Sequence, residues 1–310
     1  RSSPQVDADL HWMLQRYPMD MTEADAARLD LGRQSHLQAQ ADVGHILSEA
    51  WKPSCNAGFR EGFAPYDYQM QAAQVARRMG RLLIGDDVGL GKTISAIAAI
   101  NEKTFLPTAV IVQSHLTKQW AVDYIQKFTT LKVHIVKPRK PYRLPPADVY
   151  IFKYTNICGW VDVVQNRPFK AVILDEIQEC RHGPKTKKYQ AAQAFVAGAD
   201  LRIGLSATPI YNYGDEMFHV LDLLEPGIMG SYFDFVTEWC TRQGTHWRVA
   251  DPVALGTYLR EVNMMVRRNE HDAGWKMEKP NIIVQAVEYD ETVAESSREL
   301  ARQLAIKVTT

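Results

Sequence analysis

The chain has 310 residues, of which 46% are hydrophobic, so it can form one large domain or two modest ones with a substantial core. Lysines plus arginines number 36, and so do aspartates plus glutamates, which gives a formal net charge of zero. No global basic field therefore attracts nucleic acid, and any such contact must come from local patches. The four cysteines form no C-x-x-C pair, which speaks against a zinc ribbon or a disulfide framework.

Residues 1–60 are polar and rich in alanine and glutamine, and "MTEADAARLDL" predicts a short helix that is capped by Thr22. The side chains of His36, His45 and Cys55 invite a metal-binding interpretation. Their spacing matches no metal motif, so that interpretation is the weaker one. We expect residues 1–60 to form a small helical extension that packs against the main domain.

Short apolar runs alternate with helical patterns from about residue 63 onwards. Helical periodicity is present in "ISAIAAINE" and "LTKQWAVDYIQKF", among others. The apolar runs occupy residues 81–85, 108–113, 132–136, 148–152, 170–176 and 201–208. Strands that are apolar throughout and interleaved with helices are typical of a parallel sheet with helices on both faces. The sequence therefore predicts an α/β fold. The Pro-rich basic stretch 137–146 is favoured as a solvated loop over a contact with a nucleic-acid backbone.

"LLIGDDVGLGKTISAIAAI", residues 82–100, resembles a phosphate-binding loop between a strand and a helix. Gly89 and Gly91 allow close approach of a ligand, and the amides at the helix start can cradle phosphate oxygens. Lys92 would reach the β- and γ-phosphates, and Thr93 would hold Mg²⁺ through its hydroxyl group. An ordinary glycine-rich turn with a surface lysine is the weaker interpretation. Asp86 stands where the usual pattern has its first glycine.

A pair of carboxylates, Asp175 and Glu176, follows the apolar run "AVIL". Ligands of open α/β sheets bind at the carboxyl ends of the strands, where this pair is expected. Asp175 is positioned to hold Mg²⁺, and Glu176 to orient or deprotonate the attacking water. In "GLSATPIYN", Ser206 and Thr208 could relay the nucleotide state or cap a helix near residue 209, and these residues alone favour the cap.

In this order, the motifs resemble the first RecA-like motor lobe of the superfamily-two (DEAD/DEAH-like) helicases, and among them the Swi/Snf-type ATPases. That family has the phosphate loop D-E-x-G-x-G-K-T, and "DDVGLGKT" is similar to it. The resemblance implies a RecA-like P-loop domain over residues 61–278 that binds ATP and Mg²⁺. The implied nucleotide-binding residues are Gln69, Asp87, Gly89, Leu90, Gly91, Lys92 and Thr93, with Gln69 on the adenine.

Further stretches are similar to the family in the same order. "VIVQSHLTKQWAVDYIQKF" resembles the segment that leads from a strand to a tryptophan, here Trp120. In the family the turn after that strand contacts the DNA backbone, which implies contacts by Ser114, His115 and Lys118.

Gln178 replaces the histidine of the family's D-E-x-H. The resemblance implies that Gln178, Ser206 and Thr208 couple the nucleotide state to movement. "MMVRRNEHD" resembles the paired-arginine segment that closes the first lobe.

The resemblance implies a DNA-dependent ATP hydrolase that translocates on double-stranded DNA. Family members need a second RecA-like lobe whose arginines complete the ATP site, and none of the 310 residues resembles its motif. Residues 279–310 are expected to be a linker into that lobe. Because arginine fingers contribute on the order of 10³ to 10⁵ in rate, we expect this chain alone to bind Mg·ATP but to hydrolyse it barely, if at all.

Three alternatives remain. The protein could be a DEAH-like helicase that separates strands, or an ATP-binding regulatory module without turnover of its own. A P-loop kinase or GTPase is less favoured, because "SATP" after the acidic pair fits neither.

No signal peptide and no apolar run near 18 residues is present, which predicts a soluble cytoplasmic protein without a membrane partner. A bacterial or phage source is favoured, and a nuclear location is expected if the host is eukaryotic.

Overall fold

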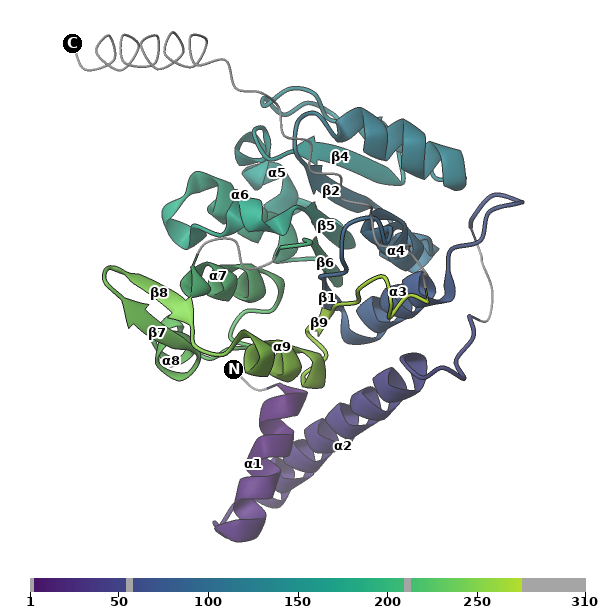
Figure 1. The fold of residues 1–310 in the computed structure, drawn as a ribbon. Helices are drawn as coiled ribbons and strands as arrows, with labels where there is room; N and C mark the ends of the chain where they lie inside the picture. The colour runs from purple at the N-terminus through teal and green to yellow at the C-terminus, as the bar shows by residue number, and fades with distance from the viewer. Residues whose placement is uncertain (1–2, 54–57, 209–212, 275–310) are drawn as a thin grey trace, which may run out of the picture. The chain divides into compact units, whose positions relative to one another are not determined.

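A seven-stranded parallel sheet forms the centre of the computed structural model, which describes residues 3–53, 58–208 and 213–274 (Figure 1). The strand order is β3-β4-β2-β5-β6-β1-β9. The strands are β1 (Arg81–Ile84), β2 (Thr108–Val112), β3 (Val133–Ile135), β4 (Val149–Lys153), β5 (Ala171–Asp175), β6 (Leu201–Leu205) and β9 (Met265–Val266). Each of the six apolar runs overlaps one of the strands β1 to β6, so the predicted α/β fold is confirmed.

Helices cover both faces of the sheet (Figure 1). Successive side chains of a strand point to opposite faces, so Leu82 and Ile84 join one buried cluster and Leu83 joins the other. The first face is covered by α3 (Asp67–Met79), α4 (Lys92–Ile100) and the π-helical segment η2 (Gln119–Gln126). The second face is covered by α5 (Val161–Asn166), α6 (Lys187–Val196), α7 (Gly214–Leu224), α8 (Tyr232–Trp239) and α9 (Pro252–Glu261). Strands buried on both faces need apolar side chains at nearly every position, which is why the runs were visible in the sequence.

Two helices, α1 (Pro4–Arg16) and α2 (Glu23–Ile46), precede the sheet and pack against each other. Thr22 caps α2 by accepting a hydrogen bond from the backbone N–H of Asp25 at 3.1 Å. The cap was predicted, but the helix is not short. It continues because its buried residues, which include Val43 and Ile46, pack against the core. Gly32 lets α1 approach closely, since a Cβ there would lie 2.1 Å from Oδ2 of Asp7.

Several elements were not predicted, a hairpin and an edge strand among them. A hairpin of β7 (Cys240–Gln243) and β8 (His246–Val249) lies between α8 and α9, and it has mostly exposed, polar side chains. The edge strand β9 is only two residues long, too short for a sequence pattern. Within the described ranges, no helix has the length and apolar character needed to cross a bilayer.

Candidate nucleotide-binding site

The loop of residues 85–91 joins β1 to α4 at the carboxyl edge of the sheet. Gly89 and Gly91 have φ angles of 92° and 73°, a region that strongly favours glycine. A Cβ on Gly91 would also lie 2.4 Å from Nε2 of Gln69. That side chain is buried behind the loop, where its Nε2 donates to the carbonyl of Leu90 at 3.1 Å and its Oε1 accepts the N–H of Tyr66 at 3.0 Å. The loop therefore has the backbone shape that a phosphate cradle needs.

Lys92 begins α4 and turns its ammonium group back into the loop. Its Nζ donates to the carbonyl oxygens of Asp86 at 2.7 Å and Asp87 at 3.2 Å. Burial lowers the pKa of Lys92, and the nearby carboxylates, with Asp86 foremost, act in the opposite direction. Thr93 follows Lys92 in the first turn of α4.

The acidic pair lies at the carboxyl end of β5, as predicted. Oδ2 of Asp175 accepts the indole N–H of Trp120 at 2.7 Å, and its carbonyl accepts the hydroxyl of Tyr154 at 2.9 Å. Burial raises the pKa of Asp175 to about 6, and the bond from Trp120 offsets part of that rise. Glu176 has a φ of 51°, which is uncommon for a non-glycine residue and marks local backbone strain. Its carboxylate accepts a hydrogen bond from Nε2 of Gln178.

The structure brings the phosphate loop and the acidic pair to one edge of the sheet. β1 and β5 are both neighbours of β6, so their carboxyl ends lie two strand spacings apart. The charges of Asp175 and Glu176 both act on Lys92. Ser206, directly after β6, is buried between them, and its backbone N–H donates to the carbonyl of Ile84 at 3.2 Å.

Ser206 also forms a local turn, because its Oγ accepts the backbone N–H of Thr208 at 3.1 Å. Thr208 is exposed. The alternative that these residues cap a helix near residue 209 concerns residues 209–212, which lie outside the described residues.

The residues expected to contact DNA lie at the same edge, after β2. Ser114, His115 and Lys118 are all exposed, and Oγ of Ser114 lies 3.5 Å from Oγ1 of Thr155 in the turn after β4. They are thus accessible to a partner on the ligand side of the sheet.

Sequence reasoning missed the partner of Asp86. This carboxylate is fully buried, and it accepts three hydrogen bonds from Arg268, which lies 182 residues away. The neighbouring Arg267 has a looser contact, with its Nη2 3.7 Å from Oδ1 of Asp87. The sequence contained two signals, namely the aspartate in place of the first glycine and the paired arginines. No feature of either stretch indicated that the two are in contact.

Oxygen donors at this edge fit Mg²⁺, which is usually held by one or two protein oxygens together with substrate phosphates. Thr93 and Asp175 supply a hydroxyl and a carboxylate of that kind. Among the described residues, no group of three or more His, Cys, Asp or Glu side chains could hold a metal ion. Cys55, which was weighed with His36 and His45 as a ligand, lies outside the described residues.

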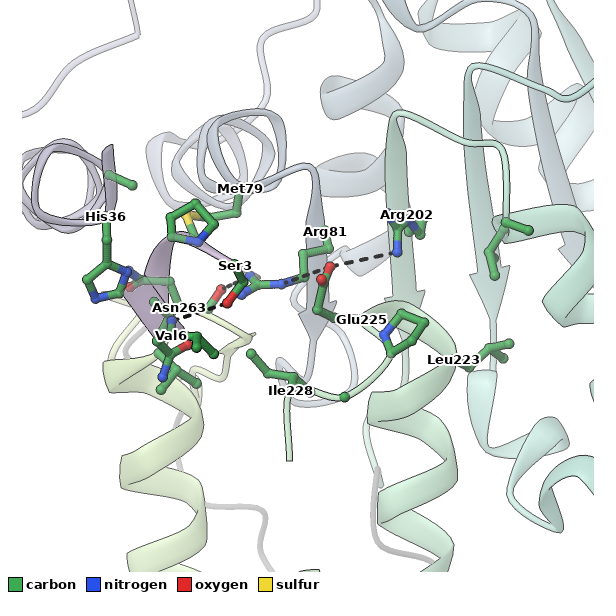
Figure 2. A pocket seen from close by; sticks show the side chains of 18 of the residues that line it. Ser3, Val6, His36, Met79, Arg81, Arg202, Leu223, Glu225, Ile228 and Asn263 are labelled. Atoms are coloured by element: carbon green, nitrogen blue, oxygen red, sulfur yellow. Dashed lines mark hydrogen bonds and ion pairs between the residues drawn. The ribbon is translucent and has the colours of Figure 1, made fainter. Parts of the chain in front are cut away.

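A separate pocket of about 1140 Å³ lies at the opposite, amino edge of the sheet (Figure 2). At its centre Glu225 pairs with Arg81 at 3.4 Å and with Arg202 at 3.7 Å. Helices α1 and α2 supply one wall, with Val6 and His36 among the lining residues. No residue of the phosphate loop or the acidic pair lines it, so it is distinct from the nucleotide-binding edge.

The parallel sheet, the phosphate loop and the acidic pair together define a RecA-like P-loop domain. Comparison with known sequences and structures then gives the family. The chain belongs to the SNF2-related domain family, whose model matches residues 7–294. The predicted resemblance to Swi/Snf-type ATPases is thereby confirmed.

Individual proteins that are similar to this chain support the same family assignment. The chain is 29% identical over 227 residues to the uncharacterized ATP-dependent helicase YqhH of Bacillus subtilis, covering 69% of this chain and 38% of that protein. It is 26% identical over 219 residues to the bovine DNA annealing helicase and endonuclease ZRANB3, covering 64% and 20%. The SWI2/SNF2 ATPase core of Sulfolobus solfataricus, solved in complex with dsDNA, has the same fold, with a TM-score of 0.60 at 23% identity over 73% of this chain and 48% of that one. The chain thus spans less than half the length of each of these relatives.

Proposed function

We propose that this chain is the ATP-binding part of a SNF2-type motor that hydrolyses ATP and moves along double-stranded DNA. The observation that carries the proposal is the convergence of Lys92, Asp175 and Glu176 at one sheet edge, next to a glycine loop of the required shape. Membership in a family of ATP-dependent helicases supports the use of ATP.

Each residue has a distinct task in this proposal. Lys92, the amides of Gly89 and Gly91 and those at the start of α4 bind the phosphates, while Thr93 and Asp175 hold Mg²⁺. The metal ion, when bound, neutralises charge on the phosphates. Glu176 orients the attacking water and accepts its proton, and Trp120 keeps the carboxylate of Asp175 directed toward the site.

We propose that the exposed side chains after β2 bind phosphates of the DNA backbone. Such contacts position a protein on the duplex without reading its sequence. Support comes from their accessibility at the ligand edge and from the archaeal ATPase core, which was solved with dsDNA. We assign the coupling role to Gln178, Ser206 and Thr208. They follow β5 and β6, the two strands that lie between β1 and β2 in the sheet, and Gln178 donates a hydrogen bond to Glu176.

We further propose that efficient turnover needs a second RecA-like lobe. The relatives extend far beyond the matched region, and a longer protein would supply the arginines that complete the ATP site. The boundaries between the helical extension, the ATP-binding lobe and the linker, at residues 60 and 278, remain predictions. Residues 279–310 lie outside the described residues.

The test combines binding and turnover. Affinity for a fluorescent ATP analogue is measured with Mg²⁺ for the wild-type chain and for Lys92→Ala, and ATPase rates are measured with and without duplex DNA. We expect Lys92-dependent binding with turnover far below about 1 s⁻¹, a common enzyme scale. Binding that does not depend on Lys92 refutes the nucleotide site. In a longer protein with both lobes, displacement of a labelled strand would indicate an unwinding helicase instead of a translocase.

A further inference from the structure

The carboxylate of Asp86 is a charge in the protein interior, at the very start of the phosphate loop. It has no solvent exposure, and a buried carboxylate is tolerated only when it is paired and hydrogen-bonded. Arg268 satisfies it completely. Its backbone N–H and its Nε both donate to Oδ1 at 3.0 Å, and its Nη2 donates to Oδ2 at 2.7 Å. This two-pronged geometry fixes the carboxylate in both position and orientation.

The same guanidinium group also reaches the far end of the loop through α3. Its Nη1 donates to the backbone carbonyl of Tyr68, and its central carbon lies 5.1 Å from the centre of the Tyr68 ring. The hydroxyl of Tyr68 in turn donates to the carbonyl of Leu90 at 3.0 Å. Arg268 is therefore connected to residue 86 directly and to residue 90 through one intermediate side chain.

Backbone pairing places Arg268 beside the loop. β9 runs parallel to β1, with Met265 opposite Leu83. The pairing continues past both strands, because the N–H of Gly85 donates to the carbonyl of Val266 at 2.7 Å and that of Asp87 to the carbonyl of Arg268 at 2.9 Å. The first half of the loop thus behaves as an extension of the sheet.

We propose that Arg268 is a positioning residue for the phosphate loop, on which nucleotide affinity depends. The proposal rests on the proposed function of that loop. Its physical reason is that Lys92 depends on the loop backbone that Arg268 holds. Nζ of Lys92 donates to the carbonyl oxygens of Asp86 at 2.7 Å and Asp87 at 3.2 Å, so a shift of these two residues after the loss of Arg268 would displace the lysine from the phosphates.

The chain contains a matched control at the other edge of the same sheet. Arg81 is also buried, with 8% side-chain exposure against 12% for Arg268, and it also pairs with a carboxylate, Glu225 (Figure 2). It connects β1 to the same C-terminal segment, because its Nη1 donates to the carbonyl of Asn263 at 3.1 Å. Loss of Arg81 should destabilise the fold without changing the phosphate loop.

The experiment compares four variants with the wild type. They are Arg268→Met, Arg268→Lys, Arg81→Met and a double variant that carries both Asp86→Asn and Arg268→Met. Two quantities are measured well below the melting temperature of each variant, namely the Kd for a fluorescent ATP analogue with Mg²⁺ and the hydrogen-exchange rate of amides 86–92 without nucleotide. We expect Arg268→Met to raise Kd about tenfold or more and to speed exchange in the loop. Arg268→Lys should be intermediate, because one ammonium group cannot replace the planar fork.

The remaining variants separate positioning from general stability. In the double variant, Asp86→Asn should recover part of the nucleotide affinity lost in Arg268→Met, because it removes the unpaired negative charge. Arg81→Met should lower the melting temperature and leave both Kd and loop exchange unchanged. Equal Kd and equal loop exchange in Arg268→Met and the wild type would overturn the proposal. If the wild type binds no nucleotide, the proposed function fails, while the exchange rates still decide whether Arg268 positions the loop.

Discussion

Trp120 donates its indole N–H to the carboxylate of Asp175 at 2.7 Å, and the residue is only 2% exposed. Trp120 belongs to η2, a π-helical segment, and such segments are frequent at functional sites. The bond joins the face of the sheet covered by η2 to the residue that we assign to Mg²⁺. An outer hydrogen bond of this kind orients a metal-binding carboxylate and tunes its charge.

Trp120→Phe keeps the ring in the core but removes the N–H donor. We expect the Mg²⁺-dependent part of nucleotide affinity to fall roughly tenfold, in line with the loss of an outer-shell partner. The measurement is the Kd for an ATP analogue with Mg²⁺ and with EDTA. Trp160→Phe is the control, because Trp160 is also buried and donates its N–H to the carbonyl of Pro138 at 3.1 Å, away from the acidic pair. An equal loss in both variants would contradict the assigned role.

Glu176→Gln removes the proposed base but keeps the size of the side chain. In a protein that carries both lobes, we expect kcat to fall by roughly 10² to 10⁴ while nucleotide affinity changes little, because general-base catalysis acts in the transition state. Steady-state ATPase assays and equilibrium binding separate the two effects. Retention of wild-type turnover would assign the base to another residue.

Lys118→Ala removes one of the exposed cations at the ligand edge. We expect weaker binding to duplex DNA of any sequence, and a plot of log K against log salt whose slope is smaller by about one. Lys103→Ala is the matched control, because Lys103 is exposed but precedes β2, at the opposite edge of the sheet. Similar slopes for Lys118→Ala and the wild type would place the DNA elsewhere.

His219 lies on α7, and we expect it to make the fold less stable at acidic pH. Burial lowers its pKa below the ordinary 6.5, although Asp215, Asp222 and Glu216 favour the charged form and Lys185 opposes it. The unfolded chain therefore takes up a proton more readily than the folded one, so this contribution to stability is present above pH 6.5 and is lost as the pH falls through the lower folded pKa.

We expect the drop in melting temperature between pH 7.5 and pH 5.5 to be smaller in His219→Gln than in the wild type. Thermal unfolding at both pH values measures it, with the exposed His271→Gln as control. An unchanged drop in His219→Gln would show that another group carries the acid sensitivity.

The sequence alone determined the strands β1 to β6 and the residues at their carboxyl ends. Strands buried on both faces must be apolar at nearly every position, and a phosphate loop needs Gly89, Gly91 and Lys92 within a few positions of one another. Such requirements are local, so they leave a readable pattern. The cap at Thr22 was visible for the same reason, while the full length of α2 was not, because its later turns are held by tertiary packing.

The tertiary structure decided which distant residues support the site. The sheet order brings β9 beside β1, so Arg268 meets Asp86 across 182 residues of sequence, and η2 carries Trp120 to Asp175. These contacts depend on which strand lies next to which and on how a helix crosses one face of the sheet. Any donor that the fold brings near can form hydrogen bonds with a buried charge. The residues next to that charge in the sequence therefore do not reveal its partner.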